Sequence, residues 1–394
     1  MTSNPTSRDY NKAAVLEVVL SQAPLTRNEV IELTGLSKAT VSRAVEELRA
    51  DGFVADGGVG AVTGRGRRST YLDVPDTTGH VAGVSFGVLT TCVLVADLRG
   101  REVCHVVAPT PNHDEVGAAA VWLAGLVEKT AAAARGPLRQ MVVAVPGRVR
   151  DGTEIFSPSR SMKIFTGSGL HRAIVDLVHA PVLVDSDANA SLLGILAEDT
   201  GIRNAALFNV SSVLNFAGCT EHELARGRTP AFGGIGVLCA GAGQETLEGL
   251  MSARGLLKFA RGRGLDLTRV EELWRGRRDD AARAGVLDAF TAAIVTATSA
   301  VAVTLDPETV YFAGRLCPLV EEILPEVRSR LDRILPAAPE IKTVPQVVGL
   351  STARGAVFAC LAPARERLRD AVLGARGRRG APSKRDFPGG STRG

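Results

Sequence analysis

The sequence predicts a multidomain protein in which a small α-rich domain precedes a larger, two-lobed α/β fold. The chain has 394 residues, more than one compact core usually accommodates. Apolar residues recur at helical spacing through the first 50 positions, whereas short apolar runs alternate with helical segments from residue 80 onward. Such alternation is typical of α/β architecture. Because 45% of the residues are hydrophobic, most of the chain should fold.

Two short helices joined by a turn are predicted within residues 24–53. Thr26 and Glu29 have the spacing of a capping box, Gly35 permits a tight turn, and Ser37 can cap the next helix. That second helix carries apolar residues at i, i+4 and i+7, so one face packs inward. Its outward face holds polar side chains placed to reach base edges in a DNA major groove, namely Lys38, Thr40, Ser42 and Arg43.

A two-stranded wing is predicted after these helices. Phe53-Val54 can start a strand, a glycine-rich turn follows, and Thr70–Leu72 alternates like a returning strand. Arginines at the tip suit phosphates or a minor groove. A helix at about 8–22 would support the module from behind. This arrangement is a winged helix-turn-helix, although a small helical pair with a solvated charged face is the alternative. It predicts double-stranded operator DNA as partner, contacted by Arg27, Ser37, Lys38, Thr40, Ser42, Arg43, Arg65, Arg67 and Arg68.

Composition excludes several other classes of protein. The net charge is only +4, so the whole chain is not a general polyanion binder, and 4% aromatic content argues against base-stacking binding of single strands. The six cysteines are widely spaced without a Cys-x-x-Cys pair, which predicts buried thiols in a reducing cytoplasm and no metal site. The N-terminus lacks a signal-peptide pattern, and no membrane partner is expected.

Composition shifts also predict the domain boundaries. We expect the winged helix-turn-helix at 1–72, a turn-rich linker at 73–79, a first α/β lobe at 80–190 completed by a C-terminal helix at 349–372, and a second α/β lobe at 191–348. The remaining residues, 373–394, are Gly, Arg, Pro and Ser with almost no apolar side chains. Such a tail cannot bury enough surface to offset chain entropy, so it should be disordered.

Three segments of the α/β region carry a family resemblance. They are Ala144-Val145-Pro146-Gly147, Phe312-Ala313-Gly314 and, most specifically, the segment from Pro181 to Ala190 that reads Pro-Val-Leu-Val-Asp-Ser-Asp-Ala-Asn-Ala. Together they resemble the ROK family of repressors, open reading frames and sugar kinases, over about 26–372. The resemblance implies an actin-like, two-lobed sugar-kinase fold, and the N-terminal winged helix implies the regulator branch of that family.

The resemblance also implies that kinase activity has been lost. In family kinases an Asp at the position of Asp187 is the general base on the sugar hydroxyl, but phosphoryl transfer also needs loops that cradle phosphate. The family's Asp-x-Gly-Gly-Thr loop corresponds to 85–89, which reads Ser-Phe-Gly-Val-Leu, and its Gly-Thr-Gly-x-Gly loop to 211–215, which reads Ser-Ser-Val-Leu-Asn. Bulky residues there block the backbone amides. We therefore expect no catalytic residue and no cofactor.

The sugar and zinc segments depart from the family as well. Its Gly-Glu-Ile-Gly-His segment appears at 233–237 as Gly-Gly-Ile-Gly-Val, and its zinc loop, at 239–246, retains Cys239 alone. One thiolate cannot hold a tetrahedral zinc. Asp187, Asn189 and Glu248 remain as candidate ligand-binding residues. Turn chemistry explains the first two equally well, and a solvated helix N-terminus explains Glu248.

These observations predict a sequence-specific DNA-binding transcriptional regulator, a repressor, that works as a dimer or tetramer. The degenerate sugar-kinase region would hold two DNA heads together, either as a constitutive dimerisation scaffold or while sensing an effector, which would be a sugar or another small metabolite. Three alternatives stay open: a sugar-responsive regulator that keeps its ligand cleft, an active sugar kinase with a DNA-binding head, and a scaffold whose winged helix binds protein.

Overall fold

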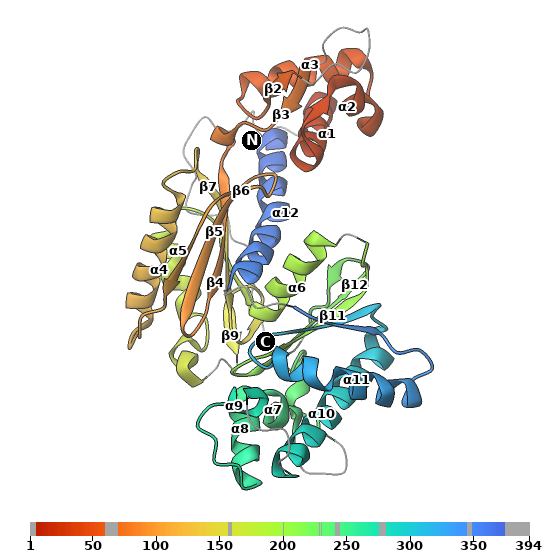
Figure 1. Ribbon diagram of the computed structural model, residues 1–394. Helices are drawn as coiled ribbons and strands as arrows, with labels where there is room; N and C mark the ends of the chain where they lie inside the picture. Colours follow the sequence, from red (N-terminus) through yellow and green to blue (C-terminus); the bar gives the residue numbers. More distant parts are fainter. Residues whose placement is uncertain are drawn as a thin grey trace, which may run out of the picture. The chain divides into compact units, whose positions relative to one another are not determined.

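The computed structural model describes residues 5–59, 70–156, 160–199, 201–227, 229, 231–240, 245–275, 281–344 and 349–374. It divides into two compact units (Figure 1). The first, here called the head, comprises residues 1–78 and 363–394, and the second, here called the body, comprises residues 79–362. The predicted disordered tail lies outside the described residues, except for the last turn of the final helix.

Among its described residues the head contains three N-terminal helices, the end of the final helix of the chain, and a three-stranded sheet of order β1-β3-β2. Its elements are α1 (Ser7–Gln22), β1 (Leu25–Thr26), α2 (Arg27–Thr34), α3 (Lys38–Ala50), β2 (Ala55–Val59), β3 (Thr70–Asp73) and the 3-10 turn η1 (Asp76–Thr78). Both helices predicted within 24–53 are present, and β2 and β3 pair as the antiparallel strands of the wing.

Local capping explains where α2 begins and ends. The Thr26 side chain accepts from the backbone N–H of Glu29, and the Glu29 carboxylate accepts from the backbone N–H of Thr26 at 2.6 Å. Gly35 ends the helix in the left-handed region at φ +66°, which a side chain would strain. The apolar face predicted for α3 is confirmed, because Val41, Val45 and Leu48 are fully buried.

The body consists of two lobes with the same sheet topology. In the first sheet the order is β10-β7-β4-β5-β6, and in the second it is β15-β14-β11-β12-β13. Each has three consecutive strands in an antiparallel meander, with two further strands added in parallel at the other edge. The first lobe contains β4 (His80–Phe86), β5 (Thr90–Asp97), β6 (Glu102–Pro109), α4 (Val116–Ala131), β7 (Leu138–Val145), β8 (Arg148–Arg150), β9 (Glu154–Phe156), η2 (Arg160–Phe165), α5 (Gly169–Leu177) and β10 (Val182–Ser186).

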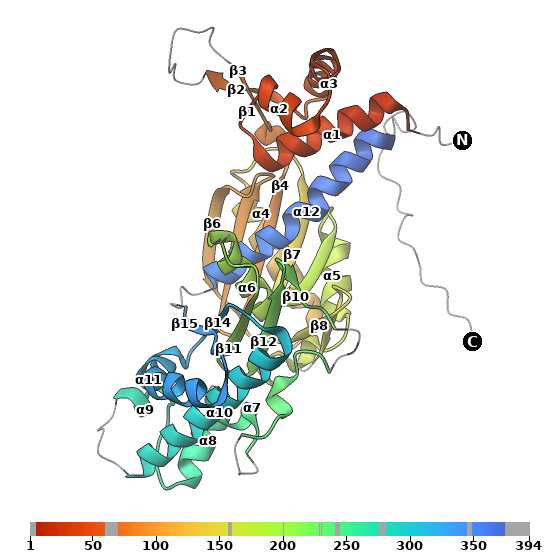
Figure 2. The same ribbon diagram turned by 90° about the vertical axis from the view of Figure 1, so that its right-hand side faces the viewer.

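The second lobe follows helix α6 (Asp187–Glu198), which begins directly after β10. One face of its sheet packs on α10 and α11, and the other packs on α6 (Figure 2). Its elements are β11 (Ala205–Val210), β12 (Leu214–Thr220), β13 (Glu223–Leu224), η3 (Ile235–Val237), α7 (Leu247–Met251), α8 (Ala253–Gly262), α9 (Glu272–Arg275), α10 (Ala281–Leu305), β14 (Thr309–Ala313), α11 (Cys317–Ile334) and β15 (Glu340–Thr343).

Helix α10 is the core helix of the second lobe. Val286, Phe290 and Ile294 are fully buried on it. Within the described ranges it is also the one helix long and apolar enough to cross a membrane, but 50% of its most apolar stretch is buried inside the body. That burial is what a core helix of a folded domain requires.

The final helix, α12 (Leu350–Gly374), belongs to both units. Its first part packs so closely on the first sheet that a Cβ added at Gly83 would lie 2.2 Å from the Ala353 carbonyl oxygen. It also crosses α6 at Gly355, where an added Cβ would overlap the Ala190 carbonyl. From Pro363 onward it groups with the head. The sequence predicts this helix at 349–372 as part of the first lobe, whereas its end groups with residues 1–78.

Candidate nucleic-acid interface and ligand cleft

The predicted DNA-contacting residues of α3 divide into capping residues and free cations. Ser37 caps the helix, because its Oγ accepts from the backbone N–H of Thr40 at 3.2 Å and lies 2.9 Å from the Thr40 Oγ1. Lys38 and Arg43 are exposed, and neither has an ion-pair partner within the described residues, while Ser42 is half-buried. The outward face therefore offers two unpaired cations to a polyanion.

Arg27, also predicted to contact DNA, is already engaged. Its guanidinium donates to the Glu46 Oε1 at 2.8 Å, which ties the start of α2 to α3. A DNA contact by Arg27 would require this exposed pair to open. The predicted wing contacts Arg65, Arg67 and Arg68 lie outside the described residues.

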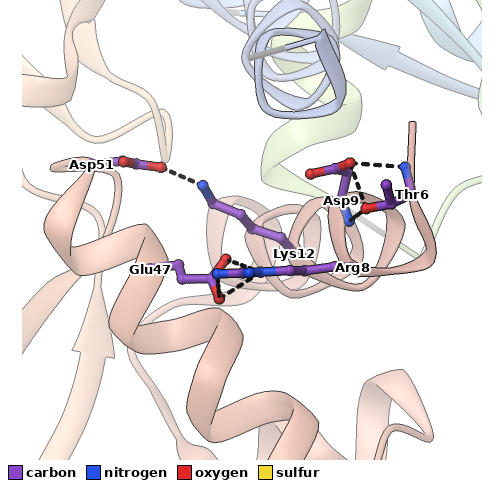
Figure 3. A network of polar contacts seen from close by, with 6 residues as sticks. All are labelled: Thr6, Arg8, Asp9, Lys12, Glu47 and Asp51. Carbon is purple, nitrogen blue, oxygen red and sulfur yellow. Dashed lines mark hydrogen bonds and ion pairs between the residues drawn. The ribbon is translucent and has the colours of Figure 1, made fainter. Parts of the chain in front are cut away.

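Two ion pairs join α1 to α3 and to Asp51, the residue that caps its C-terminal end (Figure 3). The Arg8 guanidinium contacts both carboxylate oxygens of Glu47, with its Nε at 2.9 and 3.1 Å, and Lys12 pairs with Asp51. Each helix contributes residues four positions apart, so both pairs lie along one seam. These residues were missed by sequence reasoning, although the matched spacing of two bases at 8 and 12 and two acids at 47 and 51 could have indicated them.

The same seam borders a hollow of about 270 Å³ beside the outward face of α3. Arg8 and Asn11 line it from α1, and Thr40 and Arg43 line it from α3. The head thus presents its predicted contact residues on a surface whose geometry is fixed by α1.

In the body, Asp187 lies at the start of α6, between the two lobes. Its Oδ2 accepts from the Asn209 amide at 2.9 Å and its Oδ1 from the Asn215 amide at 2.8 Å. The two asparagines are direct partners on strands β11 and β12. Burial raises the pKa of Asp187 to about 7, and the bonds from Asn215 and Asn209 oppose that shift. Both carboxylate oxygens are therefore already occupied by protein donors.

Asn189 and Glu248 are likewise satisfied within the protein. Asn189 donates to the Asp185 Oδ1 at 2.7 Å, and the other oxygen of Asp185 accepts from Arg226 at 2.9 Å. Glu248 accepts from the backbone N–H of Leu214 at 2.9 Å, and burial raises the pKa of its carboxyl group. Sequence reasoning missed Asp185 and Arg226 as members of this cluster.

The two segments that correspond to phosphate loops border one cavity of about 670 Å³. Val88 comes from the turn between β4 and β5, and Ser212 and Val213 come from the turn between β11 and β12. If the family resemblance holds here, phosphates would meet valine side chains at these turns in place of free backbone amides. No group of three His, Cys, Asp or Glu side chains that could hold a metal occurs within the part of the chain that the structure describes.

Comparisons with known proteins agree with this architecture. The model of the ROK family matches residues 81–361, and the model of the MarR family matches residues 9–60. The xylose repressor of Caldicellulosiruptor bescii is 27% identical over 192 residues, which are 48% of this chain and 47% of that protein. The xylose repressor of Bacillus subtilis is 26% identical over 48% of each chain. The chain thus spans about half the length of these two relatives.

Solved structures show the same fold. A ROK family transcriptional regulator, described as a homologue of the Escherichia coli MLC protein, superposes with a TM-score of 0.69 at 16% identity, over 93% of this chain and 98% of that one. The ROK hexokinase of Thermus thermophilus gives 0.61 at 20% identity, over 73% and 99%. The predicted fold class, a winged helix-turn-helix followed by a two-lobed α/β actin-like fold, is confirmed.

Proposed function

The chain belongs to the ROK family, and from that membership we propose that it is a sequence-specific DNA-binding transcriptional repressor. The observation that carries the proposal is the outward face of α3, where Lys38 and Arg43 stand exposed and unpaired on a capped helix. Base readout in the major groove needs such side chains near a helix N-terminus. The relatives named xylose repressor and ROK transcriptional regulator support the same function.

Pairing of two heads is part of the proposal. One winged helix covers only a short half-site, so a dimer or tetramer held by the bodies multiplies affinity and fixes half-site spacing. Such a protein would work in the cytoplasm, where its double-stranded operator DNA lies.

The body is proposed to lack kinase activity. A general base must be free to accept the proton of a sugar hydroxyl. Asp187 alone would not make a kinase, because phosphoryl transfer depends on loops that position the phosphates and neutralise their charge. Val88 and Val213 further crowd the place of the phosphates.

The test is binding to DNA from upstream of the chain's own gene. Fluorescence anisotropy with a labelled duplex should give salt-dependent binding that a scrambled duplex of equal length does not match. Incubation with ATP and a panel of hexoses should release no ADP above background. Equal affinity for both duplexes, together with ADP release, would favour the alternative of a sugar kinase with an added head.

A sugar-responsive repressor is the second candidate function. Its support is that Asp187 and Glu248 both bond to the β11–β12 hairpin, that Asn189 follows Asp187 on α6, and that two relatives are named xylose repressors. A sugar would have to exchange its hydroxyls for the internal donors. Calorimetry with xylose and other sugars decides the point, because heat that disappears in Asp187→Ala would establish the cleft.

A further inference from the structure

The cavity beside the degenerate phosphate loops carries an excess of positive charge. Four cationic side chains line it, against one carboxylate, Glu248, within the described residues. Its volume of about 670 Å³ falls within the range of small-molecule sites, roughly 300–1,000 Å³. The cations are Arg254, Lys258, Arg269 and Arg315.

Two of these cations share a single acid. The Arg315 Nε donates to Glu271 at 2.6 Å, and the Arg269 Nε lies 3.4 Å from the other oxygen of the same carboxylate. The hydrogen bond from Arg315 lowers the pKa of Glu271 to about 2, so this acid stays charged at neutral pH. One carboxylate nevertheless neutralises only one of two guanidinium groups.

The other two cations have no acidic ion-pair partner among the described residues. Arg254 and Lys258 are exposed, lie four residues apart on α8, and form no ion pair within the described chain. Like charges at this helical spacing repel each other. An anion between them would remove that repulsion, and the positive end of the α8 dipole adds to the attraction.

We propose that this cavity binds a small phosphorylated metabolite through side-chain cations. Guanidinium groups hold phosphate oxygens in pairs, and a lysine ammonium adds a point charge. Leu257 and Val270 also line the cavity, and they would contact the uncharged part of the ligand. A nucleoside triphosphate is disfavoured, because Val88 and Val213 replace the loops that would cradle its phosphate chain.

The affinity of such a ligand would depend on the separation of the two lobes. Val88 and Ser161 line the cavity from the first lobe, while the four cations belong to the second. A molecule held by both lobes has different affinity for open and closed arrangements, so it shifts the population between them. The site shares Glu248 with the candidate ligand residues of the cleft but includes neither Asp187 nor Asn189, and its test does not depend on DNA binding.

The experiment measures inorganic pyrophosphate binding to the full chain by calorimetry at 0.15 M NaCl. We expect binding to wild type, at least tenfold weaker binding to Arg254→Ala/Lys258→Ala, and unchanged binding to the matched control Lys129→Ala/Arg172→Ala. The control removes the same charge from exposed, unpaired positions on α4 and α5. Circular dichroism verifies that each variant is folded.

The conservative variant Lys258→Arg should retain binding, because it keeps the charge. No heat from wild type with millimolar pyrophosphate would overturn the proposal. So would equal weakening in the two double variants, since that result would mean general charge attraction. Tighter binding of Mg-ATP than of pyrophosphate would overturn the assignment of ligand class.

Discussion

The polar side chains on the outward face of α3 and those in the cleft around Asp187 differ in whether the protein already provides their partners. On α3, Lys38 and Arg43 project to the surface without ion-pair partners in the described residues. Around Asp187, both carboxylate oxygens accept from asparagine amides at 2.8 and 2.9 Å. The outward face of α3 leaves two cations available, whereas the Asp187 cluster uses its polar groups internally.

This difference separates a surface that can bind from a site that has become structural. A satisfied buried group can meet a ligand only by giving up a bond worth about 0.5–1.5 kcal/mol, more when a charge is involved. An unpaired surface cation loses little before it meets a phosphate or base edge. The DNA partner is therefore expected at the head, and the Asp187 cluster is expected to hold the lobes together.

The largest expected effect concerns the pH dependence of stability at Asp187. Its folded pKa of about 7 lies above the usual value near 3.8, so the folded state holds an extra proton between these values. This group's contribution to stability is therefore greatest below about pH 4 and is lost as pH rises through 7. The free energy of unfolding of wild type, relative to Asp187→Asn, should fall by at most about 4 kcal/mol from pH 4 to pH 8.

Urea denaturation of both proteins at a series of pH values checks this prediction. Asp176→Asn, an exposed carboxylate on α5, is the matched control and should show no such trend relative to wild type. A difference between wild type and Asp187→Asn that stays constant with pH would mean that the carboxylate is not buried as described.

The next effect concerns the free cations of α3. Arg43→Ala should reduce discrimination between operator and random DNA by about 1–3 kcal/mol, or roughly 5- to 150-fold, because a base contact is lost. Competition anisotropy with both duplexes measures the ratio. Arg172→Ala, an exposed arginine of the body, should leave it unchanged. Operator preference equal to wild type in Arg43→Ala would remove the recognition role from α3.

The predicted wing arginines, which lie outside the described residues, should affect affinity rather than discrimination. Arg67→Ala is expected to weaken operator and random DNA alike and to lower the salt slope by about one, as for the loss of one phosphate contact. Titrations at several salt concentrations give the slope. Selective loss of operator binding would instead place Arg67 against a base.

The smallest effect concerns the seam between α1 and α3. Lys12→Met keeps the apolar stem of a mostly buried lysine but removes its pair with Asp51, whose side chain is 46% exposed. Such half-exposed pairs contribute about 1 kcal/mol or less, so thermal stability should fall slightly. Combining it with Asp51→Ala in a double-mutant cycle isolates the pair. Additive effects would show that the seam does not couple the helices.

Local sequence signals predicted the helices of the head, but they did not predict the hydrogen bonds of the cleft in the body. The Thr26–Glu29 capping box, Gly35 and the apolar spacing of α3 act within a few residues, so their effects could be read directly. The partners of Asp187 lie 22 and 28 residues away on a hairpin, and only the tertiary fold brings them together. Residue type predicted a polar cluster at Asp187, Asn189 and Glu248, but not that the protein itself would satisfy it.

The cationic cavity and the seam were hidden for related reasons. Arg254 and Lys258 have recognisable helical spacing, but Arg269 and Arg315 join them through separate connections of the second lobe. Arg8 and Glu47 are 39 residues apart, and their pairing depends on how α1 crosses α3. The division of α12 at Pro363 likewise follows from packing rather than from its helical pattern.

The decisive measurement of DNA reading by α3 is sequencing of the genomic DNA fragments that the purified protein retains. We predict that wild type enriches one motif with two related half-sites, and that a Lys38→Ala/Arg43→Ala variant, folded by circular dichroism, loses that enrichment. Fragments without a shared motif, or the same motif retained by the variant, would contradict the assignment of DNA reading to the exposed face of α3.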